Sequence, residues 1–286
     1  IVGFHLFGSV PEPYTLYRDI RSLPAGHTQW IDESGPQPPR PFASVAEVLA
    51  SAPATPVDAG EIDSRVRAAT LDSVTRHRLA DVEVGLFLSA GVDSGALLGL
   101  MRDSGQGRVR AITLGFDEFQ GTADDETPLA AQIATLYGAE HVRRRVSEAE
   151  FREDLPRILD AMDQPSIDGI NTWFVAKAAR EAGLKVALSG LGGDEILAGY
   201  PSFTDIPRWV RWMKAPSVVP GLGRGLRKLG GALGLARRSP KALGLLEYGG
   251  GYAGAYLLRR GLFLPFELDT VLDPDLVDEG LRRLRP

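Results

Sequence analysis

A strand, a turn of small residues and a helix follow one another at residues 82–101, and this succession limits the fold more than any other feature. The strand is predicted by a short apolar run suited to burial in a parallel sheet, made of Val82, Val84, Leu86, Phe87 and Leu88. The helix is predicted by the apolar residues Ala96, Leu97, Leu98, Leu100 and Met101. The turn between them, within LSAGVDSGAL (88–97), directs backbone amides and a helix N-terminus to one point, which favours an anion.

The residues of this turn indicate a phosphate held together with a metal ion. Backbone N–H groups can approach an anion there because the side chains are small at Ser89, Ala90, Gly91 and Ser94. Asp93 would repel a phosphate unless a Mg²⁺ ion lay between them. A Walker A loop is excluded, because it needs G-x-x-x-x-G-K-[ST] and the first 170 residues contain no lysine. The alternative to a nucleotide site is a small-residue turn that lets a helix pack closely on a sheet.

A second glycine-rich turn, in LSGLGGDEILAGY (188–200), follows a short predicted strand at 185–188. Its backbone is opened by small residues, Ser189, Gly190, Gly192 and Gly193. Asp194 and Glu195 then bring carboxylates to a helix start, where the alternative is ordinary charge that complements the helix dipole. Asp93 and Asp194 could share one Mg²⁺ ion bound to phosphate oxygens, because Mg²⁺ usually takes only one or two protein carboxylates.

Strands and helices alternate through the middle of the chain. Strands are predicted at 82–88, 109–115, 140–146 and 185–188, and helices at 95–102, 127–138, 148–162 and 172–182. This alternation predicts an α/β fold, a parallel twisted sheet with helices on both faces. Ligands of such sheets lie beyond the carboxyl ends of the strands, where both glycine-rich turns fall.

The two ends of the chain differ from this alternating part, which we assign to 61–205. Residues 1–32 are predicted to form a short N-terminal β segment with turns, and 33–60, with six prolines, a linker. Residues 206–286 are predicted to be helical. Within them, 206–246 contains nine Lys or Arg and no Asp or Glu, which indicates either a solvated basic face or a surface that helps hold a triphosphate or a partner domain.

Composition excludes several classes of function. The net charge of −5 argues against nucleic acid as a partner, since recognition of a phosphate backbone needs an excess of basic over acidic residues. Without cysteine there is no disulfide, thiolate zinc site or cysteine nucleophile, and the four histidines show no metal-ligand spacing. No run approaches the ~20 apolar residues of a membrane span, and no signal peptide is present, so we expect no membrane partner and a cytoplasmic location.

LSAGVDSGAL together with LSGLGGDEILAGY resembles the synthetase domain of the glutamine-dependent asparagine synthetases, a family that includes β-lactam synthetases. The first turn is similar to the PP-loop, S-G-G-x-D-S, of enzymes that adenylate a substrate and release pyrophosphate, with Ala90 in place of the first glycine. Phe116, the acidic run Asp124-Asp125-Glu126 and MDQPSIDGINTW (162–173) add to the resemblance. It implies an adenine nucleotide alpha hydrolase-like fold of the PP-loop ATPase kind. Residues 1–32 resemble the closing strands of the family's glutaminase domain.

The resemblance also implies a site for ATP and Mg²⁺. The pyrophosphate portion of ATP would be held by Ser89, Gly91, Asp93 and Ser94, with Ala90 in the same turn. The adenine pocket would be lined by Leu88 and Leu114 and by the backbone at Ser189 and Gly190. Mg²⁺ would be coordinated by Asp93 and Asp194, and the catalytic residues would be Asp93, Asp194 and Glu195.

The implied reaction is an AMP-forming amide ligation. The side-chain carboxylate of aspartate attacks the α-phosphate of ATP to give an acyl-adenylate and pyrophosphate, and ammonia then displaces AMP. In a complete enzyme of this kind the ammonia comes from glutamine through a glutaminase domain. The expected partners are therefore small molecules, and the family allows a homodimer.

Leu191 departs from the family pattern, because many asparagine synthetases have Glu at this position and Leu cannot move protons. We also expect the glutaminase nucleophile and a C-terminal basic residue to lie outside these 286 residues, as in a fragment or a processed product. Two alternatives stay open. One is the same activation chemistry on another carboxylate, as in β-lactam synthetases, and the other is a nucleotide-binding fragment without turnover.

Overall fold

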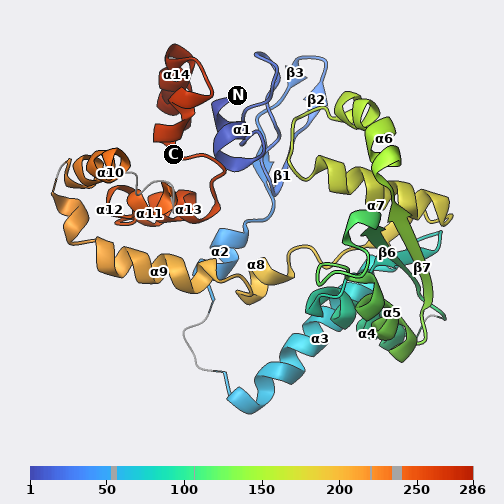
Figure 1. Ribbon diagram of the computed structural model, residues 1–286. Coiled ribbons are helices and arrows are strands. Elements are labelled where there is room, and N and C mark those ends of the chain that lie inside the picture. Colours follow the sequence, from blue (N-terminus) through green and yellow to red (C-terminus); the bar gives the residue numbers. More distant parts are fainter. Residues whose placement is uncertain (53–56, 106, 220, 234–239, 286) are drawn as a thin grey trace. The chain divides into compact units, whose positions relative to one another are not determined.

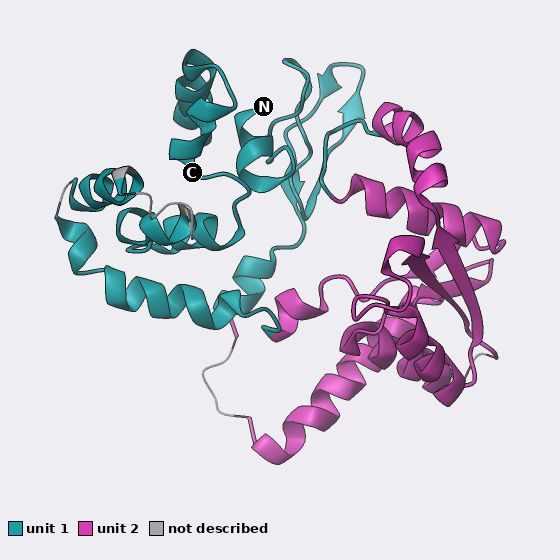
Figure 2. Cartoon of the chain, viewed as in Figure 1, with its two compact units in different colours: residues 1–50, 162–167, 198–286 teal, residues 51–161, 168–197 magenta. Residues whose placement is uncertain are grey.

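The computed structural model describes residues 1–52, 57–105, 107–219, 221–233 and 240–285 (Figure 1). Part of the predicted linker, 53–56, and part of the basic stretch, 220 and 234–239, lie outside these ranges. The chain divides into two compact units (Figure 2). Unit 1 comprises Ile1–Ala50, Met162–Ile167 and Ala198–Pro286, and unit 2 comprises Ser51–Ala161 and Asp168–Leu197.

Unit 2 is built on a four-stranded parallel sheet of order β7-β6-β5-β8. The strands are β5 (Val84–Phe87), β6 (Arg110–Phe116), β7 (Glu140–Val146) and β8 (Val186–Leu188). β5 is the first strand of this sheet in the chain and lies between β6 and β8: the chain passes from β5 through β6 to β7 on one side, and then crosses to β8 on the other side of β5. Such a reversal of strand order opens a crevice beyond the carboxyl ends of the two strands.

Helices cover both faces of this sheet, which confirms the predicted fold class. The helices of unit 2 are α3 (Ala59–His77), α4 (Val92–Asp103), η1 (Asp117–Phe119), α5 (Thr127–Leu136), α6 (Glu148–Ala161), α7 (Gly169–Glu181) and α8 (Gly193–Leu197). Ala111 packs in one buried cluster with Leu86 and Leu98, whereas its neighbour Ile112 packs in another with Ala178 of α7. Successive residues of a strand point to opposite faces, so β6 has a buried cluster on each side.

Two helices start three residues earlier than the sequence predicted. α4 begins at Val92 rather than 95, after Gly91 at the N-cap, so that Asp93 lies in its first turn. α7 begins at Gly169 rather than 172. The observed starts precede the predicted ones because small and polar residues, which favour turns in a local reading of the sequence, are tolerated in the first turn of a helix that packs on a sheet.

The prediction of β structure for the first ten residues was wrong, because Val2–Phe7 form the helix α1. Val2 and Leu6, one helical turn apart, are buried in a cluster with Leu257 and Val277. α1 ends at Gly8, whose φ of 78° is a common helix terminator. The apolar run IVGFHLF is compatible with the periodicity of a helix and with that of a strand. Burial against residues distant in the sequence favours the helix.

Short antiparallel ladders and a helix follow α1 in unit 1. β1 (His27–Thr28) pairs with β4 (Arg40–Pro41), and β2 (Ile31–Asp32) pairs with β3 (Gly35–Pro36). α2 covers Val45–Ala50. The predicted linker therefore contains regular structure, and the two compact units group the residues differently from the four predicted segments, whose identity as domains stays a prediction.

The C-terminal part of unit 1 is mainly helical in its described residues, as predicted for 206–286. It contains α9 (Ser202–Met213), η2 (Pro216–Val218), α10 (Leu222–Ala232), α11 (Pro240–Leu243), α12 (Leu245–Tyr248), α13 (Tyr252–Arg260), η4 (Pro265–Thr270) and α14 (Pro274–Leu284). Part of the basic stretch is not a solvated face, since Arg227 pairs with Glu247 at 2.6 Å and stacks over Phe266. Within the described residues, no helix is long and apolar enough to cross a membrane.

Candidate functional site

The turn between β5 and α4 is braced by two serine hydroxyls. The hydroxyl oxygens of Ser89 and Ser94 lie 2.9 Å apart, and the Ser89 N–H donates to Ser94 Oγ at 3.1 Å. The Gly91 N–H donates to Ser89 Oγ, also at 3.1 Å. Ala90 fits this turn without strain, because its φ is not positive; among the described non-glycine residues only Ala198 and Arg285 have a positive φ. The substitution of Ala for glycine in the PP-loop pattern is therefore compatible with the backbone.

Leu88 holds the end of β5 in place below the turn. Its side chain is only 2% exposed, its N–H donates to Ile112 O at 2.8 Å, and its carbonyl accepts from Thr113 Oγ1 at 2.7 Å. The Thr113 oxygen accepts in turn from His141 Nε2 at 2.8 Å. Burial, helped by the charge of Arg143, lowers the pKa of His141 and so favours its neutral imidazole. Leu88 thus has a core role, and its predicted contact with adenine stays a prediction.

The second turn packs directly against Asp93. A methyl group at Gly190 would lie 3.1 Å from both Asp93 Cβ and the Ser94 amide nitrogen. A methyl group at Gly193 would lie only 2.4 Å from Asp93 Oδ2. Glycine at these two positions therefore lets the turns after β5 and β8 meet at the crevice between the strands. Gly192, with a φ of 97°, is needed for a different reason, because L-residues rarely adopt that conformation.

The structure brings together some of the predicted site residues and not others. Ser89, Gly91 and Ser94 form the braced turn, and Asp93 lies against Gly190 and Gly193, with Asp194 the next residue in α8. Ser189 Oγ accepts from the Leu191 N–H at 3.3 Å. Leu114 packs with the Ile112 cluster, on the other face of the sheet from Leu88. Glu195 is exposed, in the first turn of α8.

Sequence reasoning missed a carboxylate at the first turn. The Ala90 N–H donates to Oε2 of Glu126, at 3.3 Å, from the start of α5. Asp125 fixes this point, since its carboxylate accepts from the Thr127 hydroxyl at 2.6 Å and from Arg145 Nη2 at 2.9 Å. These two hydrogen bonds hold the pKa of Asp125 well below its usual range. The run Asp124-Asp125-Glu126 just before a predicted helix was the available signal.

A largely apolar groove of about 640 Å³ extends from Asp93 along α4. Its walls are formed by α3, α4, the second turn and α8, with apolar side chains from Val66, Leu97, Leu100, Tyr137, Ile196 and Leu197. The one cation in the described lining, Arg67, is paired with Asp103 at 2.5 Å. At the mouth of the groove Leu191 is 89% exposed.

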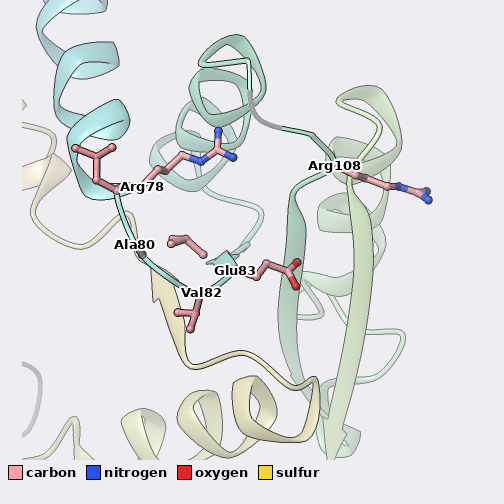
Figure 3. A pocket seen from close by; sticks show the side chains of 7 residues that line it. Arg78, Ala80, Val82, Glu83 and Arg108 are labelled. Atoms are coloured by element: carbon pink, nitrogen blue, oxygen red, sulfur yellow. The ribbon is translucent and has the colours of Figure 1, made fainter.

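A second, smaller cavity of about 270 Å³ lies where α3 leads into β5 and where the chain enters β6 (Figure 3). It is lined by Arg78, Leu79, Ala80, Val82, Glu83, Val84 and Arg108. This is the amino end of the strands, opposite the glycine-rich turns. Since ligands of parallel sheets bind at the carboxyl end, the turns and the groove are the better candidate site.

Comparisons with known proteins agree with these sequence patterns. The family model for asparagine synthase matches residues 65–255, which contain both turns. The chain is 36% identical over 200 residues to a putative asparagine synthetase [glutamine-hydrolyzing] of Mycobacterium tuberculosis, covering 68% of this chain and 29% of that protein. It is 33% identical over 199 residues to asparagine synthetase [glutamine-hydrolyzing] 1 of Bacillus subtilis, with the same coverage. Amidase chyE of Penicillium rubens is 28% identical over 165 residues, covering 50% of this chain and 23% of that protein. The chain thus spans less than a third of the length of these relatives.

Proposed function

The chain belongs to the asparagine synthase family, and on this premise we propose that it is an ATP-dependent, AMP-forming amide ligase. Its nucleotide site would lie at the turns around Asp93 and Asp194, with aspartate and ammonia as the further substrates. The observation that carries the proposal is the meeting of the two glycine-rich turns at Asp93, between β5 and β8. This is the position where parallel sheets with reversed strand order bind ligands.

The residues present fit a nucleotide with a magnesium ion. The Ala90 amide is bonded to a carboxylate of Glu126, which supports the proposal that this turn accepts an anionic oxygen. Carboxylate oxygens are ligands that Mg²⁺ prefers, and Asp93 and Asp194 supply the one or two that it usually takes. Among the described residues no group of three or more His, Cys, Asp or Glu is placed to hold a metal ion. Bound Mg²⁺ would supply neutralisation of the triphosphate charge.

The chain's own groups would act by binding and orienting. Ser89 and Ser94 keep the turn in one shape, and the first-turn amides of α4, which have no partner within the helix, would hold the pyrophosphate portion. A carboxylate held in line with the α-phosphate then forms the new C–O–P link as pyrophosphate leaves, and ammonia displaces AMP from the acyl-adenylate. Orientation of the two reactants is the main contribution that such a site can make.

A second candidate is the same chemistry on a larger, apolar carboxylate. Leu191 presents an apolar side chain where the acid–base group of many asparagine synthetases would lie, and the groove that it borders is mainly apolar. The groove also lacks, in its described lining, a cation that is not already paired, such as the free carboxylate of aspartate would need. Relatives named as amidases further broaden the range of acceptors to test.

The experiment is an assay of AMP and pyrophosphate release from Mg²⁺-ATP, with ammonia and either aspartate or a panel of apolar carboxylic acids. Release that depends on an added acid, and that is absent in Asp93→Asn, supports the proposal. The acid that gives the highest kcat/KM distinguishes the two candidates. Nucleotide binding without pyrophosphate release for any acid contradicts both and favours a binding protein without turnover.

A further inference from the structure

Glu126 accepts a hydrogen bond from one of the backbone amides that could bind an anion at the first turn. Its Oε2 accepts the Ala90 N–H at 3.3 Å, although Ala90 belongs to the turn after β5 and Glu126 to the start of α5 after β6. The contact joins residues 36 positions apart, and the parallel pairing of β5 with β6 places these strand ends together. A phosphate oxygen directed at the same amide would meet a like charge.

The backbone around Glu126 is firmly held. Asp125, whose side chain is 6% exposed, accepts from the Thr127 N–H at 3.1 Å in addition to its bonds from the Thr127 hydroxyl and Arg145. Gly115 provides the room, since a methyl group there would lie 2.8 Å from Thr127 Cγ2. The charge of Asp125 is balanced by Arg145, 2.9 Å away. Glu126 is therefore the carboxylate of this segment that contacts the turn and brings an unbalanced negative charge to it.

We infer that Glu126 is a specificity-determining residue that makes nucleotide binding at this turn depend on a divalent cation. The inference rests on the proposed function. Free ATP would bring its full negative charge toward two carboxylates, Glu126 and Asp93. A cation-complexed nucleotide carries less charge and meets less repulsion, so it displaces Glu126 from the Ala90 amide at a smaller cost. Glu126 thereby discriminates against free polyphosphates.

Three variants separate charge from shape. Glu126→Gln removes the charge but keeps an oxygen that can accept the Ala90 N–H. Glu126→Ala removes the charge and the acceptor. Asp124→Asn makes the same charge change two residues away, on an exposed side chain of the same loop, and is the matched control.

The measurement is the Kd of ATP by isothermal titration calorimetry, with Mg²⁺ and with EDTA in its place. For Glu126→Gln we expect the Kd in EDTA to fall about tenfold, as a unit charge roughly 5 Å away gives at an effective dielectric constant near 50, and the Kd with Mg²⁺ to stay within about twofold. Asp124→Asn should change neither value by more than about twofold.

Two results overturn the inference. If Glu126→Gln leaves the ratio of the two Kd values unchanged, or changes it no more than Asp124→Asn does, Glu126 does not discriminate. If Glu126→Ala weakens binding equally with and without Mg²⁺ while Glu126→Gln has no effect, the contact only braces the turn. Absence of binding by the wild-type chain under both conditions refutes the proposed function, and the inference with it, and is distinguishable from these two results.

Discussion

Substituting Gly193 by alanine should separate the stability of the fold from the function of the site. Gly193 is the first residue of α8, and its φ is not positive, so alanine can adopt the backbone conformation. In a helix alanine is favoured over glycine by about 0.8–1.0 kcal/mol. The added methyl group, however, would lie 2.4 Å from Asp93 Oδ2 and 2.6 Å from Asp93 Cγ.

The clash falls on the end of a side chain, which determines its consequences. To reach an ordinary contact of about 3.4 Å, the Asp93 carboxylate has to move by about 1 Å, which a rotation of its side chain can provide with little loss of folding free energy. A displacement of that size at a metal-binding or reacting group can reduce function by about 100-fold. We therefore expect a change in unfolding free energy within about 1 kcal/mol and a loss of Mg²⁺-ATP affinity of about 10- to 100-fold.

Urea denaturation and calorimetric titration with Mg²⁺-ATP measure the two quantities on the same preparation. Gly60→Ala in α3 is the matched control, because its methyl group meets only Asp58 Oδ1, at 3.7 Å. It should leave the affinity unchanged and raise the unfolding free energy by no more than the ~1 kcal/mol by which a helix favours alanine over glycine. Retention of full affinity by Gly193→Ala would refute the idea that the second turn sets the position of Asp93. A large loss of stability would show that the methyl group displaces backbone rather than the carboxylate.

Three further predictions concern unit 2. Lys177→Met should cost about 1–3 kcal/mol in urea denaturation, because it removes the cation at 2.6 Å from the Asp154 carboxylate, which is only 4% exposed and keeps Trp173 Nε1 at 3.2 Å as a donor. Gly85→Ala should cost a similar ~1–3 kcal/mol by the same measurement, since its methyl group would lie 2.2 Å from Leu184 Cδ1. The lowered pKa of His141 means that below about pH 6.5 the unfolded chain binds more protons than the folded one, so stability decreases as the pH falls through that range. His141→Asn should flatten this part of the stability profile between pH 7 and pH 5, and an unchanged slope would contradict the assignment.

The core of the fold could be predicted because its signals are local. β5, β6 and β8 are short, mainly apolar runs, and each strand, including the charged β7 (EHVRRRV), is followed by a turn residue or a helix start within a few positions, so strand order did not need to be known. The structure confirms the parallel sheet with helices on both faces. α1 could not be predicted in the same way, because IVGFHLF fits either periodicity and its burial against Leu257 and Val277 involves residues more than 250 positions away.

Local sequence signals also predict one part of the candidate site and miss another part. The small residues of the two turns and their position after strands are visible in the sequence, and the resemblance to asparagine synthetases follows from them. The contact between Gly193 and Asp93 joins residues 100 positions apart, and it depends on β8 pairing with β5 rather than with β7. The bond from Ala90 to Glu126 likewise depends on the order of β5 and β6. Both contacts depend on the tertiary arrangement of the strands, which no local sequence pattern contains.

Whether the two turns form a nucleotide site can be measured by calorimetric titration of the wild-type chain and of Asp93→Asn with Mg²⁺-ATP. We expect one nucleotide per chain for the wild type, and a loss of affinity of tenfold or more for Asp93→Asn with an unchanged thermal unfolding midpoint. Absence of nucleotide binding by the wild-type chain, or equal affinity in the variant, would contradict the assignment of these two turns as the nucleotide site.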